Sequence, residues 1–221
     1  MDDAIQTVAD RLRTVFDLGG PVVMVLLAVS VIVVAVVLYK LWQFSAAGVG
    51  RHKALREAVA AWDSGDRAGA RAELSRSRSY LAGLVADAFA SPTESRDRLW
   101  AEAEARFARL ESGFRFLDNV AQIAPLLGLF GTVLGMIDAF RALQDAGAQV
   151  DPSILAGGIW VALLTTAVGL VVAMPSALVL AWLEGRMQAE RVTAETLLMR
   201  VLYPNGARAG GADPAHASAH A

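Results

Sequence analysis

The sequence has 221 residues, of which 55% are hydrophobic and 19% are charged, and its formal net charge is −2. This composition is more apolar than that of an ordinary soluble domain. Because the sequence has no cysteine, disulfide bonds and thiolate metal sites are excluded. The apolar residues are concentrated in three runs, each long enough to provide the roughly 20 residues that cross a bilayer.

Residues 1–19 form an acidic segment ahead of the first apolar run, which covers residues 20–42. A secretory signal peptide would begin with basic residues and would have a shorter apolar core. The acidic start and the length of the run therefore favour a retained transmembrane helix over residues 20–42.

Residues 43–118 combine charged residues with Ala, Leu and Phe at helical spacing, which predicts a series of amphipathic helices. One helix is expected to present Leu55, Val59 and Trp62 on a single face and to end at the sequence "SGD". A second helix is expected at about residues 67–90.

The sequence "SPTE", residues 91–94, is typical of a helix start, because it combines a capping side chain, an early proline and a glutamate in the first turn. The helix that follows has apolar residues at helical spacing over residues 99–117. No strong helix breaker separates it from the second apolar run, residues 119–140. We therefore expect the second transmembrane helix to extend well beyond the membrane.

The second run carries Gly128, Gly131 and Gly135 on or beside one helical face, and the last two form a GxxxG motif. Small residues let transmembrane helices approach closely, because packing drives helix association in lipid. The third apolar run also carries a row of small residues at helical spacing. They are Ala162, Thr166, Gly169 and Ala173. These two stripes predict close contact between the second and third transmembrane helices.

The third run covers residues 154–182 and follows a short link over residues 141–153. A helical pattern continues from it over residues 183–203, so the third transmembrane helix is also expected to extend beyond the membrane. Glycine, alanine and proline dominate residues 204–221, a composition that is typical of a disordered tail.

Thr132 and Thr166 lie near the middle of the second and third runs. Because the two runs are antiparallel, we expect the two side chains at a similar depth, where they would provide a shared polar surface. Alternatively, each hydroxyl bonds to a carbonyl of its own helix. Thr165 is about 100° from Thr166 around the helix and cannot point the same way. Thr165 and Asp138, at the far end of the second run, are further candidates for a pore or an interface.

The distribution of basic residues predicts the orientation of the chain. Thirteen Lys and Arg residues lie from Lys40 to Leu117, whereas the link before the third run has one, Arg141. The positive-inside rule places the long segment and the C-terminus in the cytoplasm, and the N-terminus and the short link in the periplasm. Lys40, Arg51 and Arg115 carry most of this argument, because they lie close to the ends of the runs.

The sequence has no combination of residues that is typical of an active site or a metal centre. Its three histidines, His52, His216 and His220, lie outside the apolar runs, which disfavours an intramembrane serine protease. His216 and His220 are four residues apart, but they belong to the expected disordered tail, so we expect no metal there. The mixed signs of charge disfavour a nucleic-acid surface. We therefore expect neither an enzyme nor a protein with a cofactor.

The sequences "APLLGLFGTVLGMIDAF" (124–140) and "GGIWVALLTTAVGLVVAMPSAL" (157–178) resemble the MotA/TolQ/ExbB proton-channel family, and its ExbB and TolQ branch most closely. The resemblance covers about residues 99–200. It implies an all-α protein of the bacterial inner membrane with three transmembrane helices, which assembles as a pentamer. In such a pentamer the second and third helices would line a central pore, and the first would pack outside.

The resemblance also implies partners and roles. The pore would hold a single-span protein resembling ExbD or TolR, whose membrane aspartate would carry protons. The resulting motion would reach a periplasm-spanning protein such as TonB or TolA. The pore threonines of the family match Thr132 and Thr166 here, which would supply a polar surface while the partner supplies the titrating group.

One position departs from the family pattern. ExbB and TolQ proteins usually carry a glutamate five residues before the third-helix threonine, and this position is Val161 here. Valine neither titrates nor accepts a hydrogen bond. Two interpretations therefore remain open, a proton-driven motor with an altered pathway and a non-conducting membrane scaffold of the same fold.

Overall fold

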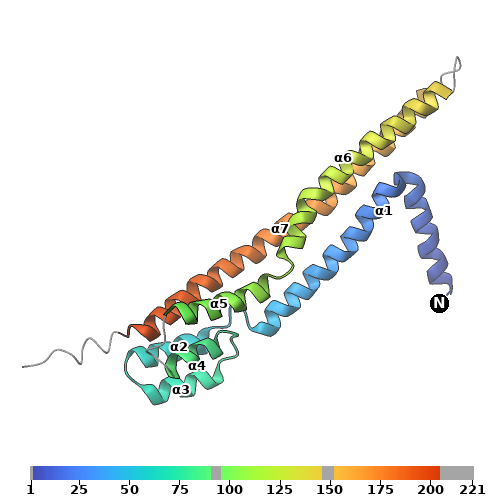
Figure 1. The fold of residues 1–221 in the computed structure, drawn as a ribbon. Helices are drawn as coiled ribbons and strands as arrows, with labels where there is room; N and C mark the ends of the chain where they lie inside the picture. Colours follow the sequence, from blue (N-terminus) through green and yellow to red (C-terminus); the bar gives the residue numbers. More distant parts are fainter. Residues whose placement is uncertain (1, 91–95, 146–151, 205–221) are drawn as a thin grey trace, which may run out of the picture. The chain divides into compact units, whose positions relative to one another are not determined.

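The computed structural model describes the backbone of residues 2–90, 96–145 and 152–204 and, apart from residues 2–19 and Ile154, their side chains. Every regular element in this part of the chain is an α-helix (Figure 1). The helices are α1 (Asp2–Ala47), α2 (Lys53–Asp63), α3 (Arg67–Arg76), α4 (Ala82–Ala90), α5 (Arg96–Glu111), α6 (Phe114–Asp145) and α7 (Pro152–Leu202). The predicted all-α class is confirmed, and among the described residues three helices are long and apolar enough to cross a membrane.

Some predicted features lie outside the described residues. They are the helix-start sequence at 91–94, residues 146–151 of the short link, and residues 205–221 of the tail, with His216 and His220.

The chain divides into two compact units. The apolar unit contains the described residues of 1–38 and 113–182, and the charged unit contains those of 39–112 and 183–221. Helices α1 and α7 contribute residues to both units. The charged unit therefore contains most of the charged residues of the segment between the first two spans, together with those that follow Trp182.

In the apolar unit, α1 is interrupted at Gly20, whose φ of 64° and ψ of −168° are not helical. Glycine adopts a positive φ without a Cβ clash, and the following Pro21 has a backbone suited to a helix start. Beyond this break the helix exposes Val31, Val34 and Leu38, each more than half accessible. An apolar surface of this kind is suited to lipid or to another membrane helix.

The core of the charged unit is built around aromatic stacking. The rings of Trp62 and Phe89 stack with their centroids 4.1 Å apart, and the Arg67 guanidinium lies 3.5 Å from the centroid of the Trp62 ring. The indole Nε1 of Trp62 donates to the Val201 carbonyl at 3.2 Å. These contacts hold α2 against α4 and the end of α7, and they keep the indole N–H satisfied although the side chain is buried.

The structure corrects one expectation about the second transmembrane helix. The amphipathic helix over residues 99–117 does not continue into the span, because α5 ends at Glu111 and α6 begins at Phe114. Gly113 between them has φ 91°, in the left-handed region that favours glycine. The break is therefore a helix end at a glycine, which the apolar periodicity of the segment conceals.

The helix expected at about residues 67–90 is also two helices, α3 and α4. Between them, the Ser77 Oγ accepts a hydrogen bond from the Ser79 N–H at 3.3 Å, and the Ser79 Oγ accepts one from the Leu81 N–H at 3.1 Å. Serine side chains that bond to nearby backbone groups compete with the helical pattern, which explains the break.

Lys40 is turned into the charged unit and is only 1% exposed. Its Nζ donates to the Leu110 carbonyl at 3.0 Å, to the Gln43 Oε1 at 2.7 Å and to the Ser112 Oγ at 3.3 Å. A cation is favourable at the C-terminal end of a helix, here α5, where carbonyls are left without helical partners. Lys40 therefore has a structural role in this unit, and its charge also supports the predicted orientation of the chain in the membrane.

A second buried polar cluster surrounds Glu190, eight residues beyond Trp182 on α7 and 3% exposed. Its carboxylate contacts the His52 Nε2 at 2.8 Å and accepts hydrogen bonds from the Tyr80 hydroxyl and the Gly50 N–H, both at 2.9 Å. The other ring nitrogen of His52 lies 2.9 Å from the Ser79 Oγ. One carboxylate thus connects α7 to the turn after α1 and to the loop before α4.

Burial opposes the ionisation of Glu190 and is the largest single influence on its pKa. The hydrogen bond and charge interaction with His52, and the bonds from Tyr80 and Gly50, together outweigh burial and lower the pKa below its usual value. Burial and the neighbouring Glu190 raise the pKa of Tyr80, against the weaker opposing charges of Arg191 and Arg106. Tyr80 therefore remains a hydrogen-bond donor to an ionised Glu190.

Acid is predicted to destabilise the charged unit through Glu190. A carboxylate with a lowered folded pKa stabilises the fold above its unfolded pKa of about 4.3, and the effect is lost as the pH falls through the folded pKa. The thermal unfolding temperature of the detergent-solubilised protein should therefore decrease as the pH is lowered below about 4.3. Glu190→Gln should remove that step, and at pH 7 should cost about 1–3 kcal/mol of unfolding free energy.

Glu184→Gln is the matched control, because Glu184 is an exposed carboxylate on the same helix of the same unit. It should leave both the midpoint at pH 7 and its acid dependence unchanged. Equal effects of the two substitutions would show that Glu190 has no special role in stability.

Candidate functional site

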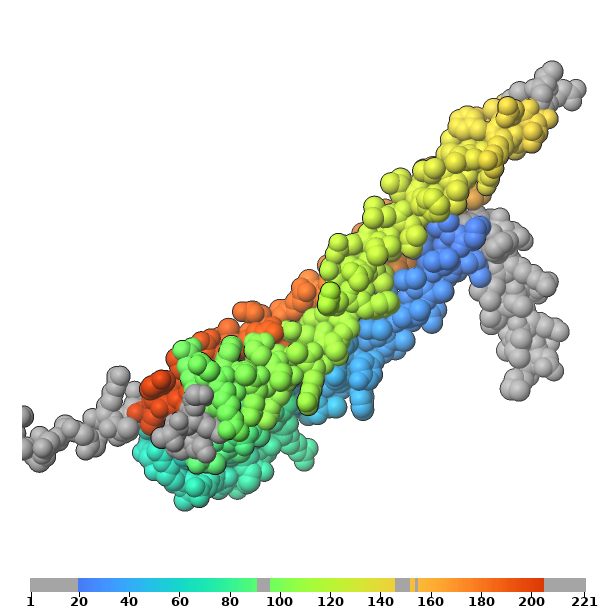
Figure 2. Space-filling model, viewed as in Figure 1, coloured from blue at the N-terminus to red at the C-terminus, as the bar shows by residue number. Residues whose placement is uncertain are grey.

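Helices α6 and α7 lie side by side in the apolar unit (Figures 1 and 2), and their backbones approach closely at three glycines. A Cβ added at Gly128 would lie 2.9 Å from the Thr165 carbonyl oxygen, and one at Gly169 would lie 2.6 Å from the Ala124 carbonyl oxygen. One at Gly135 would lie 3.2 Å from the Ala162 Cβ. At the first two positions a side chain would force the helices apart, so glycine is needed there for this packing.

The remaining glycine of α6, Gly131, faces a side chain. A Cβ at this position would lie 2.7 Å from the Thr165 Oγ1 and 2.8 Å from the Thr165 Cβ. Thr165 is 2% exposed, and Ala162 and Ala173 of the same helix are also buried. The small residues that the sequence pattern singled out on the two helices are thus found in or beside one contact.

The structure corrects the assignment of one threonine to this contact. The sequence pattern put Thr166 on the small-residue stripe of the third span, whereas the side chain that fills the space at Gly131 is Thr165. Positions 165 and 166 lie about 60° and 40° to either side of Ala162 around a helix, so spacing alone does not separate them. Thr166 approaches this contact with its backbone, since its Cα lies 3.0 Å from a Cβ built on Gly128.

The hydroxyls of Thr132 and Thr166 differ in their hydrogen bonding. The Thr132 Oγ1 donates to the Leu129 carbonyl of its own helix at 2.6 Å. The Thr166 Oγ1 is buried and has no hydrogen-bond partner in the described part of the chain. The carbonyl that Thr166 would use four residues earlier, that of Ala162, already accepts from the Thr165 Oγ1 at 2.7 Å. The Thr166 hydroxyl is thus enclosed without a hydrogen bond in this part of the chain.

The other candidates lie away from this contact. Asp138 is 77% exposed, and its carboxylate is 4.0 Å from the guanidinium of Arg141, one turn further along α6. Val161 is half-buried, next to the tightly packed Ala162. The structure therefore brings together Thr165 and the glycines of α6, but it does not bring Asp138 to them.

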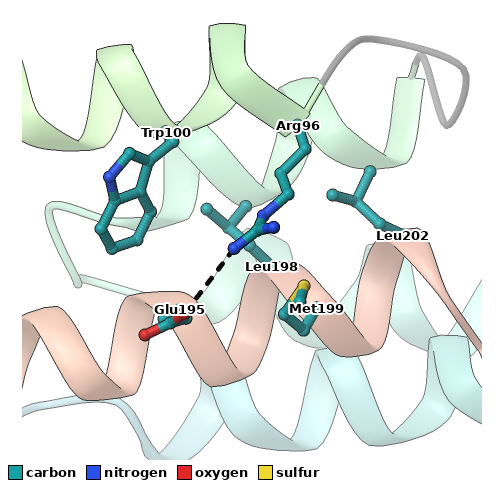
Figure 3. A pocket seen from close by; sticks show the side chains of 6 residues that line it. All are labelled: Arg96, Trp100, Glu195, Leu198, Met199 and Leu202. Carbon is teal, nitrogen blue, oxygen red and sulfur yellow. Dashed lines mark ion pairs between the residues drawn. The ribbon is translucent and has the colours of Figure 1, made fainter.

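A hollow in the charged unit lies between α5 and α7 (Figure 3). Its lining is mainly apolar, and its residues are Arg96, Trp100, Glu195, Leu198, Met199 and Leu202. The Arg96 guanidinium lies 3.8 Å from the Glu195 carboxylate, and both side chains are more than half exposed. Exposed ion pairs of this kind contribute little to stability, and this one lies beside an apolar wall without a nucleophile.

Sequence reasoning missed the two buried polar clusters, because their members are far apart in the chain. His52 and Glu190 are separated by 138 positions, and Lys40 and Leu110 by 70. His52 was noted only as a residue outside the apolar runs. Among the described residues, no group of three or more His, Cys, Asp or Glu side chains could hold a metal ion. The hydrogen bonds of the two clusters join separate segments of the charged unit.

Gly131→Leu is predicted to separate α6 from α7, because the new side chain would occupy the space of Thr165. Overpacking of this kind typically costs about 1–3 kcal/mol. The oligomer extracted in mild detergent should dissociate or aggregate on a sizing column. Val133→Leu, at a half-exposed position of the same helix, is the control and should elute as the wild type does. Normal elution of Gly131→Leu would contradict the packing described above.

Comparison with known proteins gives a family match that covers α3 to α6 and most of α7. The family described as "MotA/TolQ/ExbB proton channel family" matches residues 62–196, which is more than half of the chain. The putative biopolymer transport protein ExbB-like 1 of Synechocystis is 32% identical over 179 residues, which are 78% of this chain and 70% of that protein.

Two further relatives match a shorter stretch. The biopolymer transport protein exbB1 of Vibrio cholerae is 44% identical over 68 residues, and the Tol-Pal system protein TolQ of Haemophilus influenzae is 46% identical over 67 residues. These alignments cover 31% and 30% of this chain, and 30% and 29% of the two relatives. The chain thus spans less than a third of the length of these two proteins.

The family match, the relatives and the three membrane-length helices agree on a multi-pass protein of the inner membrane. They also confirm the resemblance seen in the paired motifs of the second and third spans, and the names of the relatives agree with its ExbB and TolQ branch. The chain belongs to the MotA/TolQ/ExbB proton channel family.

Proposed function

We propose that this chain is a subunit of a proton-conducting motor that couples the proton motive force to outer-membrane transport or to maintenance of the envelope. The observation that carries the proposal is the Thr166 hydroxyl, which is buried without a hydrogen-bond partner among the described residues. A buried hydroxyl without a partner is costly, so its persistence in a membrane helix favours a functional role for Thr166.

The titrating group of the pathway is proposed to come from a partner. The sequence has no Asp, Glu, Lys or Arg between Asp118 and Asp138, or between Asp151 and Glu184. The central parts of both helices are therefore without charge, and a proton carrier has to be supplied by another chain. A small single-span protein with a membrane aspartate, resembling ExbD or TolR, fits this requirement. One charge that crosses 100 mV provides about 2.3 kcal/mol.

The same proposal covers the assembly of the subunits and the orientation of the chain in the membrane. The chain would form a homo-oligomer, with five copies expected from the family, in which α6 and α7 face the partner and α1 faces outward. Thr132 and Thr166 would line the pore, and a TonB- or TolA-like protein would receive the motion. The N-terminus would lie in the periplasm and the C-terminus in the cytoplasm, in agreement with the excess of basic residues in the segment after α1.

The second candidate function is a non-conducting scaffold of the same fold, and Val161 is the observation in its favour. Without the family glutamate, the oligomer would tether a partner through its small-residue faces and would move no protons. The two functions differ in proton flux and share the oligomer, so flux measurements on an intact complex distinguish them.

Thr166→Val is predicted to lower proton flux by roughly tenfold, because valine preserves the shape of the side chain and removes the hydroxyl. Flux would be measured with a pH-sensitive dye in vesicles that contain the complex purified with its partner. Thr193→Val is the control, since the Thr193 hydroxyl bonds to its own helix in the charged unit. Unchanged flux in an intact Thr166→Val complex would remove Thr166 from the pathway.

Val161→Glu is predicted to insert and assemble, because the added carboxylate would face protein or water. At a lipid-facing position the same charge would cost about 2.5–3.5 kcal/mol. Trp160→Glu provides that comparison, since Trp160 is 65% exposed on the neighbouring face of α7, and it should reduce the yield of assembled complex. Equal losses of assembly in both variants would indicate that Val161 faces lipid.

A further inference from the structure

Thr165 occupies a notch on α6 that exists because residue 131 is a glycine. Three atoms of the threonine, Oγ1, Cβ and Cγ2, would lie 2.7, 2.8 and 3.1 Å from a Cβ added at Gly131. With 2% of its surface exposed, Thr165 is enclosed by the two helices. The fit leaves little freedom for α7 to rotate about its axis or to slide along α6, because either motion would drive the side chain into the α6 backbone.

The hydroxyl of Thr165 adds a directional contact to this fit. It lies 3.1 Å from the Gly128 carbonyl of α6 and 2.7 Å from the Ala162 carbonyl of its own helix. Its single proton is shared between the two oxygens, as in other three-centre hydrogen bonds. The Gly128 carbonyl is reachable because position 128 has no side chain, and a Cβ there would lie 2.9 Å from the Thr165 carbonyl.

The same hydrogen bond affects the neighbouring residue. Thr166 would ordinarily satisfy its hydroxyl on the carbonyl of Ala162, four residues earlier. Because Thr165 already donates to that carbonyl, the Thr166 Oγ1 is left without a partner in the described part of the chain. The orientation of α7 and the direction in which Thr166 points thus depend on one side chain.

We propose that Thr165 is a positioning residue of the proton pathway, which sets the rotation of α7 against α6 and thereby the direction in which Thr166 points. This inference rests on the proposed function, since it assigns Thr165 a role at the same site. Thr165 itself faces Gly131 and does not face a pore. Its effect on protons is exerted through Thr166 and through the contact between the two helices.

The first test compares Thr165→Val with Thr165→Ser in the full chain, purified with its native partner and placed in vesicles. Valine keeps the shape and loses the hydroxyl, whereas serine keeps the hydroxyl. Proton flux per assembled complex should fall about three- to tenfold in Thr165→Val, as expected for one interhelical hydrogen bond, and should stay within about twofold of wild type in Thr165→Ser. If Thr165 acted by packing alone, Thr165→Val would retain more proton flux than Thr165→Ser.

The second test measures the register of the helices without reference to protons. Because the sequence has no cysteine, a Gly135→Cys and Ala162→Cys pair can be cross-linked without background. The two Cβ positions lie 3.2 Å apart, close to the separation in a disulfide. The rate of cross-linking should fall in the Thr165→Val background and remain normal with Thr165→Ser. Val133→Cys with Ala162→Cys is the control pair, on a half-exposed position of α6.

The outcomes separate this inference from the proposed function. Reduced flux and slower cross-linking in Thr165→Val, both recovered in Thr165→Ser, would support it. Wild-type flux in Thr165→Val, normal cross-linking in that variant, or no advantage of serine over valine would overturn it. If the wild-type complex passes no protons, the proposed function fails. Cross-linking alone then decides whether Thr165 sets the register of the helices.

Discussion

The close approach of the α6 and α7 backbones is the constraint on which the apolar unit depends. Gly128 and Gly169 bring main-chain atoms within reach of each other, and Gly131 leaves the space that Thr165 fills. In lipid there is no hydrophobic driving force between helices, so contacts of this kind and the hydrogen bonds across them hold the pair together. The same contact decides which hydroxyls are satisfied inside the chain, and that of Thr166 has no hydrogen-bond partner among the described residues.

The charged unit is organised by buried polar groups with complete sets of partners. Lys40 bonds to the end of α5, and Glu190 is bonded by groups from two separate segments, the turn after α1 and the loop before α4. Burial of a charged group is costly unless it is paired and hydrogen-bonded, and breaking such a cluster is correspondingly destabilising. These residues therefore specify how the short helices α2 to α5 pack with the end of α7, which apolar contacts alone would leave less well defined.

The apolar runs and the small-residue stripes were sufficient to predict an all-α membrane protein and the family. The breaks between helices were not predictable from periodicity, because Gly113 and the serines before α4 act through local backbone geometry while the apolar pattern continues across them. Thr165 and Thr166 lie about 60° and 40° to either side of Ala162 around the helix, so only the folded structure shows which of them fills the space at Gly131. The pairing of His52 with Glu190 depends on the tertiary fold.

The central claim is that this chain works as one subunit of a motor that contains a second, titratable membrane protein. The most direct measurement is the mass and composition of the complex extracted gently from native membranes. The account predicts a homo-oligomer that carries one or two copies of a small single-span protein with an aspartate in its membrane segment. A homo-oligomer without such a protein would contradict the motor and would leave the scaffold as the better description.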